Sequence, residues 1–262
     1  MTLAANAPAQ RRWSRATVVA HAFTILFFLA WWGYSHIIPA YQLPSPWLVA
    51  SRIWTFVRDS QELAELGLSL LHVSIAIGIA FIAGCILAGL AHWVRPLRLL
   101  IDGRLTPFLN AFSGIGWLFL GIVWFGLDSF TVIFAVTLIL LPFTIINVRT
   151  GLQEIDSDLI ELGKSLSRSP WRTAFKIVVP LLVPYLFTAL RNGFGVSWKV
   201  VLTAELFGGN AGVGYMLNVA RQQFDTETIF AIIAFIFIFV ACAEIILFRP
   251  IQRALDRRFA RG

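Results

Sequence analysis

Long runs of residues without charge most constrain what this chain can fold into. A helix needs about 20 mostly apolar residues to cross the hydrocarbon core of a bilayer. Runs of that length are plain at residues 16–35, 66–91, 105–127 and 129–148. Only 13% of the 262 residues are charged, roughly half the share found in soluble domains. The sequence therefore predicts an all-α polytopic membrane protein.

Two further stretches extend this prediction to six spans. They are apolar over most of their length, although the first contains Arg191, Lys199 and Glu205. The expected spans cover about 16–35, 67–91, 105–126, 129–148, 181–207 and 228–248, all within a membrane domain at 16–248, with a polar segment at 1–15 and a basic tail at 249–262. After the first span, Ser45 as a cap and Pro46 at the first helical position predict a short helix with an apolar face.

Two spans contain residues that disturb a helix. The first half of the third span holds Pro107, Asn110, Ser113, Gly114 and Gly116, which loosen it and leave small or polar atoms there. The fourth span contains Pro142, which predicts a kink because proline removes a backbone donor.

The distribution of basic residues predicts the orientation. With six spans, both termini lie on one side, and that side collects sixteen of the 21 Lys and Arg residues. The opposite side has three, and two lie within the fifth span. Cytoplasmic loops carry the excess of Lys and Arg. We therefore expect both termini in the cytoplasm.

One polar segment, at 154–180, interrupts the apolar chain on that same side. Asp158 precedes an apolar run and has Glu161 three residues on, which is typical of a capped helix start. Ser169 followed by Pro170 predicts a second helix start. The pattern predicts two short helices, at about 159–166 and 170–178. A structured polar segment between spans is expected to bind a partner in the water.

The sequence lacks the motifs of several other functions. No His, Cys and carboxylate cluster has the spacing of metal ligands, and no nucleophile motif is present. Gly163-Lys164-Ser165 resembles the end of a phosphate-binding loop, but Asp158 stands where that loop requires glycine. The basic residues sit at span ends, which argues against nucleic acid. Cys85 and Cys242 lie within apolar runs and predict buried side chains rather than a disulfide. We expect no cofactor or metal bound by this chain.

The polar segment resembles the "EAA" loop of permease subunits in binding-protein-dependent ABC importers. Glu161, Gly163, Ile177 and Pro180 match that motif at its spacing, whereas Ser167 stands where the motif has glycine. The replaced glycine forms the turn in the family, and Ser169-Pro170 is an alternative way to form it.

Other segments extend the resemblance over nearly the whole chain. LPSPWLVASRIW at 43–54 is similar to the family's segment after the first span, and IVWFG at 122–126 is similar to the end of its third. TAEL at 203–206 and GVGYM at 212–216 resemble the nitrate, sulfonate, taurine and bicarbonate branch.

The resemblance implies a type I ABC importer permease fold, with six transmembrane helices and a cytoplasmic coupling helix. It implies a non-catalytic subunit of the bacterial inner membrane, whose alternating access is driven by a cytoplasmic ABC ATPase dimer that binds ATP and Mg. A periplasmic binding protein would deliver the solute, a small organic or inorganic anion such as a sulfonate, taurine or nitrate. A second, identical permease copy would complete the pathway. The residues expected to couple to the ATPase are Asp158, Glu161, Gly163, Ser167, Arg168, Ile177 and Pro180.

Polar residues within the spans have two interpretations that the sequence leaves open. The candidates for the translocation pathway are Asn110, Ser113, Ser197, Lys199 and Glu205. The hydroxyl and amide groups can equally form hydrogen bonds between helices. Glu205 can equally pair with Lys199 or Arg191, and Arg191 can extend toward the cytoplasm. At the level of function, the alternative is a secondary transporter or intramembrane enzyme that works without an ATPase.

Overall fold

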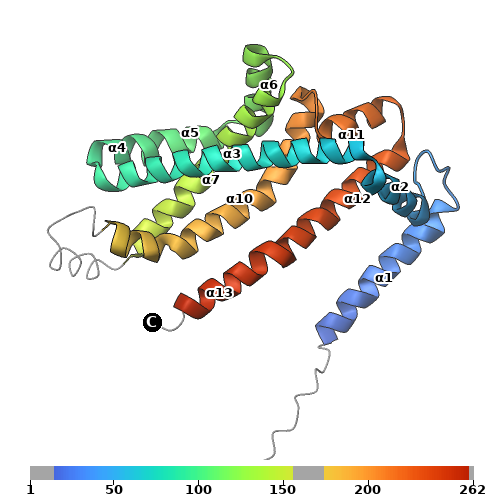
Figure 1. Ribbon diagram of the computed structural model, residues 1–262, viewed down its shortest axis with the longest axis horizontal. Helices are drawn as coiled ribbons and strands as arrows, with labels where there is room; N and C mark the ends of the chain where they lie inside the picture. Colours follow the sequence, from blue (N-terminus) through green and yellow to red (C-terminus); the bar gives the residue numbers. More distant parts are fainter. Residues whose placement is uncertain (1–14, 156–173, 260–262) are drawn as a thin grey trace, which may run out of the picture.

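The structure, a computed structural model, describes residues 15–155 and 174–259, and every regular element in those two ranges is helical. This agrees with the predicted all-α class. In chain order (Figure 1) the elements are α1 (Arg15–Ser35), α2 (Pro46–Arg58), α3 (Ser60–Trp93), α4 (Arg95–Leu100), η1 (Ile101–Leu105), α5 (Thr106–Ala111), α6 (Gly114–Phe125), α7 (Ser129–Glu154), η2 (Ala174–Val178), α10 (Val179–Gly208), α11 (Val213–Gln222), α12 (Thr226–Ala243), η3 (Glu244–Phe248) and α13 (Arg249–Phe259).

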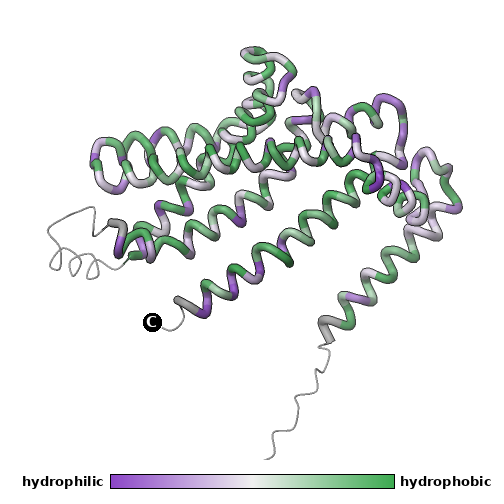
Figure 2. Tube along the Cα trace, viewed as in Figure 1, coloured by the Kyte–Doolittle hydropathy of each residue, from purple (hydrophilic) through white to green (hydrophobic). Residues whose placement is uncertain are grey.

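Five described helices are long and apolar enough to cross a membrane, and a bent pair makes up to six. The five cover Val18–Ser35, Ser60–Trp93, Ser129–Glu154, Lys176–Gly208 and Thr226–Arg257. Figure 2 shows hydrophobic colour along these helices and hydrophilic colour in the connections and along α13. The second helix begins at Ser60, before the expected 67, because the Asp59 side chain accepts a hydrogen bond from the backbone N–H of Gln61 and caps it.

The third expected span, at 105–126, is not one helix. Its first part begins already at Arg95 and ends at Ala111, and α6 follows at an angle of 84°. Phe112 and Ser113 adopt extended backbone angles between the two parts. Figure 1 shows α4 and α5 running back beside α3, while α6 turns away from them. The sequence predicted a loosened helix at this position, but only the structure shows that the helix is broken.

The helical core is formed by α3, α7 and α10. Val132, Val136 and Val201 are among its fully buried side chains. These helices approach one another closely where one of them presents a small residue to its neighbour. A Cβ atom on Gly84 of α3 would lie 2.6 Å from Thr144 Cγ2 of α7, so only glycine permits this contact.

The ends of the chain differ in how they contact this core. In α2, Ser45 Oγ accepts a hydrogen bond from the Leu48 N–H and Pro46 stands in the first turn, as predicted. The last span continues through η3 into α13 as one rod (Figure 1). By contrast, α1 stands apart, and its residues 18–35 contribute nothing to the buried core. An apolar groove of about 890 Å³, lined by Phe27, Trp31 and Phe230 among others, separates it from α12.

Candidate functional site

The segment expected to couple to a partner lies mostly outside the described residues. This applies to Asp158, Glu161, Gly163, Ser167 and Arg168. Ile177 is half-buried in η2, and Pro180 is exposed in the first turn of α10. A separate helix was expected to end at 178, but η2 continues directly into α10. The structure thus describes the helix ends on either side of this segment.

These helix ends, the C-terminus of α7 and the start of α10, are in tight contact. A Cβ atom on Gly151 of α7 would lie 2.6 Å from Cγ of Tyr185 on α10. The Tyr185 hydroxyl donates a hydrogen bond to Glu154, the last residue of α7. Around them, Ala88, Val148, Leu152, Val178 and Leu182 form a second buried cluster. Displacement of either helix end must therefore move the other, because the two ends are closely packed and leave no space between them.

The same end of α7 is also joined to the segment before the bend. Arg149 has only 8% of its side chain exposed, and its Nη2 donates to Asp102 Oδ2 of η1 at 2.7 Å. A buried arginine needs a carboxylate of this kind, because an unpaired charge there would be costly. The pair links the α7 terminus to η1 and thereby to the bent helix pair.

Glu205 has partners other than those that the sequence suggested. Its carboxylate is fully buried and bonds neither Lys199 nor Arg191. It accepts hydrogen bonds from Ser69 Oγ at 2.7 and 2.9 Å, and it lies 2.7 Å from His72 Nδ1. Both partners are on α3. Pairing within α10, one of the interpretations that the sequence left open, is therefore wrong. Lys199, 6 positions before Glu205, lies on another face of the helix, and Arg191, 14 positions before it, lies about 21 Å away along the helix axis.

This carboxylate also holds the glycine-rich loop that follows α10. The N–H of Gly214 donates to Glu205 Oε2 at 2.8 Å, and the N–H of Val213 donates to Ser69 Oγ at 2.8 Å. Gly212 has a φ of +98°, and its N–H donates to Glu65. Three successive backbone N–H groups thus donate to side chains of α3 and α10, two of them to carboxylates and one to the Ser69 hydroxyl. The loop start is fixed to the bundle, and Glu205 does not line an open pathway within this chain.

Ser69 and His72 were not identified by the sequence analysis. They are three residues apart on one helix, which places them on one face. A serine and a histidine on one face of an otherwise apolar span indicate a polar contact with a neighbouring helix. Which helix supplies the partner depends on the tertiary structure.

Three further polar residues of the spans are satisfied within the chain. Arg191 bonds Glu244 of η3 and Gln252 of α13. Ser197 is fully buried, and its hydroxyl donates to the Phe194 carbonyl at 2.8 Å. Asn110 is exposed on α5, and its amide donates to the Thr106 carbonyl at 3.2 Å. The hydrogen bonds of Ser197 and Asn110 are thus made to their own helices.

Ser113 and Lys199, by contrast, come together. They line a hollow of about 310 Å³ between α6, α7 and α10, together with Thr203. The remaining lining is apolar: Gly114, Ile115, Leu118, Ala135, Ile139, Val200 and Ala204. Two of the five predicted pathway residues thus line one cavity, Ser113 at the bend between α5 and α6 and Lys199 on α10.

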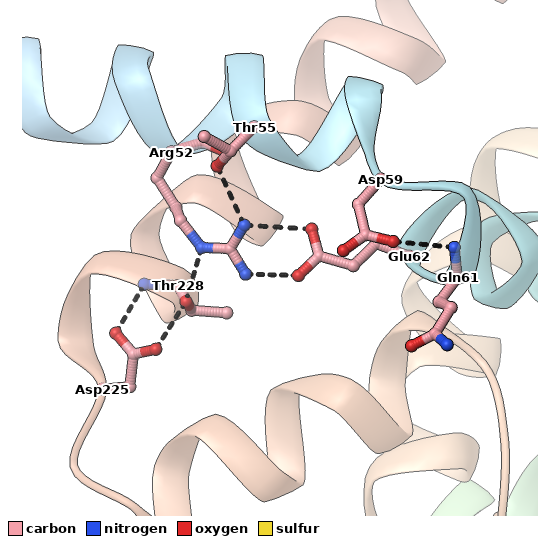
Figure 3. A network of polar contacts seen from close by, with 7 residues as sticks. All are labelled: Arg52, Thr55, Asp59, Gln61, Glu62, Asp225 and Thr228. Atoms are coloured by element: carbon pink, nitrogen blue, oxygen red, sulfur yellow. Dashed lines mark hydrogen bonds and ion pairs between the residues drawn. The ribbon is translucent and has the colours of Figure 1, made fainter.

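A second polar network, which the sequence analysis did not identify, joins α2, α3 and the start of α12 (Figure 3). The Arg52 guanidinium makes two hydrogen bonds to the Glu62 carboxylate and one, at 2.9 Å, to Thr228 Oγ1. The Thr228 hydroxyl in turn donates to Asp225 Oδ2 at 2.6 Å. The hydrogen bond with Glu62 raises the pKa of Arg52 above its ordinary value. Arg52 therefore stays charged and holds the three helix ends together.

Metal and disulfide chemistry find no support among the described residues. No group of three or more His, Cys, Asp or Glu residues in the described ranges could hold a metal ion. Both cysteines are free. Cys85 is half-buried, but Cys242 is exposed on α12, which corrects the expectation that both are buried.

Comparison with known proteins identifies what shares this architecture. Residues 18–261 match the family described as binding-protein-dependent transport system inner membrane component. The bicarbonate transport system permease protein CmpB of Synechocystis sp. is 29% identical over 251 residues, covering 86% of this chain and 85% of that protein. The taurine transport system permease protein TauC of Escherichia coli is 26% identical over 259 residues, covering 94% and 91%.

A solved structure supports the fold independently. It is a crystal structure of an amino acid ABC transporter with histidines. It superposes with a TM-score of 0.60 at 18% identity and covers 75% of this chain and 92% of its own. At that identity the likeness concerns the fold alone.

Proposed function

This chain belongs to the binding-protein-dependent transport system inner membrane components, and we propose that two identical copies of it form one translocation pathway. The family defines it as a multi-span permease subunit of an ABC importer in the inner membrane, a transport subunit and not an enzyme. Its partners are therefore an ATPase subunit and a substrate-binding protein. A secondary transporter or intramembrane enzyme is not favoured.

The proposal assigns coupling to the segment 154–180. Asp158, Glu161, Gly163, Ser167, Arg168, Ile177 and Pro180 contact the ATPase, which alone binds ATP and Mg. Both termini lie in the cytoplasm, in agreement with the positive-inside distribution.

One observation carries this assignment: the contact of Gly151 with Tyr185, at the α7 and α10 ends that flank the segment. A displacement of the segment moves both helices together, because they are closely packed at this contact. The same two helices form walls of the hollow that contains Lys199. ATP-driven motion at one end of α7 and α10 thus changes the hollow at the other, as a rigid-body mechanism requires.

The solute is proposed to be a small organic or inorganic anion, such as a sulfonate, taurine or nitrate. Relatives named for bicarbonate, taurine and aliphatic sulfonates support this class. A relative named for riboflavin, 29% identical over 221 residues, is an exception. The pathway polar groups are Ser113 and Lys199, with Asn110 exposed nearby on the other side of the bend. Ser197 and Glu205 are proposed to hold in place the part of α10 that lines the hollow.

Co-purification tests the coupling assignment. The chain is co-expressed with its candidate ATPase subunit, and the amount of ATPase retained on the tagged permease is measured. Glu161→Lys is expected to reduce retention several-fold while membrane insertion is unchanged. Glu227→Lys, which makes the same charge change at the start of α12 near the opposite membrane face, is the matched control and should retain the ATPase. Full retention by Glu161→Lys would contradict the docking role, and solute transport in liposomes without any ATPase would contradict the importer.

A further inference from the structure

Lys199 differs from three other charged residues within the described spans. Arg149, Arg191 and Glu205 each bond a partner of another helix. No ion pair joins Lys199 to a carboxylate of the described residues, and its side chain is exposed. A lysine at the centre of a span costs roughly 3 kcal/mol when it faces lipid. An unpaired one therefore indicates a water-filled cavity or a ligand.

The surroundings of Lys199 contain hydrogen-bonding groups but no negative charge. The hollow of about 310 Å³ is lined by no acidic residue. Ser113 Oγ lines it and has no hydrogen-bond partner among the described residues. Thr203 Oγ1 donates to the Lys199 carbonyl, so it leaves only acceptor capacity. The first turn of α6 begins at Gly114 in the same wall, and no side chain caps it. Apart from the Thr203 oxygen, the available groups are thus a cation and hydrogen-bond donors.

We propose that this hollow binds the oxyanion group of the transported solute, with Lys199 supplying the charge and Ser113 a hydrogen bond. This inference rests on the proposed function, and it narrows the solute to small molecules with a sulfonate, carboxylate or comparable planar or tetrahedral oxyanion. Charge-assisted hydrogen bonds to such a group are about twice as strong as neutral ones. The apolar walls formed by Ile115, Leu118 and Ile139 accept a short alkyl group. A cationic solute would be repelled.

The bend between α5 and α6 is what creates the site. If the helix continued straight through Phe112 and Ser113, the N–H groups of residues 114–116 would bond carbonyls of the preceding turn. The 84° break frees them and turns Ser113 into the hollow wall. Half-helix starts that point at anionic groups are a recurring feature of transporters. Here the independent observation is the unpaired Lys199.

Charge-selective thiol labelling tests the proposal on the assembled importer. The permease carries Cys85→Ala, Cys242→Ala and Ser113→Cys, and it is reconstituted with its ATPase in phosphatidylcholine nanodiscs. The two probes are sulfonatoethyl methanethiosulfonate, itself a small organic sulfonate, and trimethylammonioethyl methanethiosulfonate. We expect the sulfonate probe to react faster. Lys199→Gln should lower the ratio of the two rates about tenfold, and Lys199→Arg should preserve it.

Two controls make the result specific to the hollow. With only Cys85→Ala introduced, the native Cys242 reports on an exposed position of α12, and its rate ratio should not respond to Lys199→Gln. An uncharged methanethiosulfonate reports accessibility and should react equally in all variants. If Ser113→Cys does not fold, Thr203→Cys provides a second reporter in the same cavity.

Competition identifies the occupant. Methanesulfonate should slow labelling by the sulfonate probe in a saturable way, whereas choline at equal ionic strength should not. Protection seen only in phosphatidylglycerol nanodiscs would assign the site to lipid phosphate and overturn the solute proposal. A rate ratio unchanged by Lys199→Gln would overturn the anion site altogether. Retention of the ATPase in the same nanodiscs is measured separately, so failure of the importer assignment and failure of the site are distinguishable.

Discussion

The Glu205 carboxylate on α10 lies 2.7 Å from Nδ1 of His72 on α3, and both side chains are almost wholly buried. The Ser69 hydroxyl and the N–H of Gly214 also donate hydrogen bonds to that carboxylate. One side chain thus joins two spans to the loop that follows α10. Its removal affects all of them at once.

Replacement of Glu205 by alanine should destabilise the protein strongly. It leaves His72, Ser69 and a backbone N–H buried without their partner, which costs roughly 3 kcal/mol. Thermal unfolding in detergent, followed by size-exclusion chromatography, measures the effect. Glu227→Ala at the start of α12 is the control and should change the midpoint little. Equal midpoints for the two variants would show that the buried network is dispensable.

Gly212→Ala should disturb the same loop by a steric route. The φ of Gly212 is +98°, and an added Cβ would lie 2.4 Å from the Glu205 carboxylate. The positive φ and the steric overlap both disfavour alanine, so we expect the free energy of unfolding to fall by about 2 kcal/mol or more. Gly78→Ala on α3 is the matched control, because nothing lies within 4 Å of its added Cβ. That helical position should be neutral or gain stability, and a loss at Gly78 as large as that at Gly212 would refute the steric explanation.

Arg52→Ala should loosen α2 from α3 and α12. Arg52 joins Glu62 and Thr228, and its loss leaves a carboxylate that is only 17% exposed without its partner. We expect a loss of about 2 kcal/mol and faster hydrogen exchange at the N-terminal turns of α3 and α12. Arg58→Ala removes a guanidinium that lies 4.5 Å from the Trp54 ring centroid on the same helix. It should cost about 1 kcal/mol or less and leave exchange at α12 unchanged.

Gly151→Ala should separate coupling from ATP hydrolysis. The added Cβ would lie 2.6 Å from Tyr185 Cγ and force α7 and α10 apart beside the coupling segment. We expect less solute transported per ATP hydrolysed, measured in proteoliposomes that contain the complete importer. Gly89→Ala on α3, where nothing lies within 4 Å, should keep the ratio of the unmodified protein. A normal ratio in Gly151→Ala would mean that this contact does not transmit the motion.

The sequence by itself determined the class, the family and the start of α2. Hydropathy, charge distribution and capping are properties of neighbouring residues, and residues 43–54 or 203–206 can be compared with a family without coordinates. The same local reasoning anticipated that Asn110, Ser113 and Lys199 differ from ordinary span residues. It could not tell which of them meet.

Only the tertiary structure decided which residues meet. Ser69 and Glu205 are 136 residues apart in the chain, and Arg52 and Thr228 are 176 apart. No local pattern encodes such pairs, because they depend on which helix faces are packed together. The same holds for the break at Phe112 and Ser113, where a loosened helix becomes a bend of 84°. That bend places Ser113 in the wall of the hollow that Lys199 also lines, and so the hollow exists only in the folded protein.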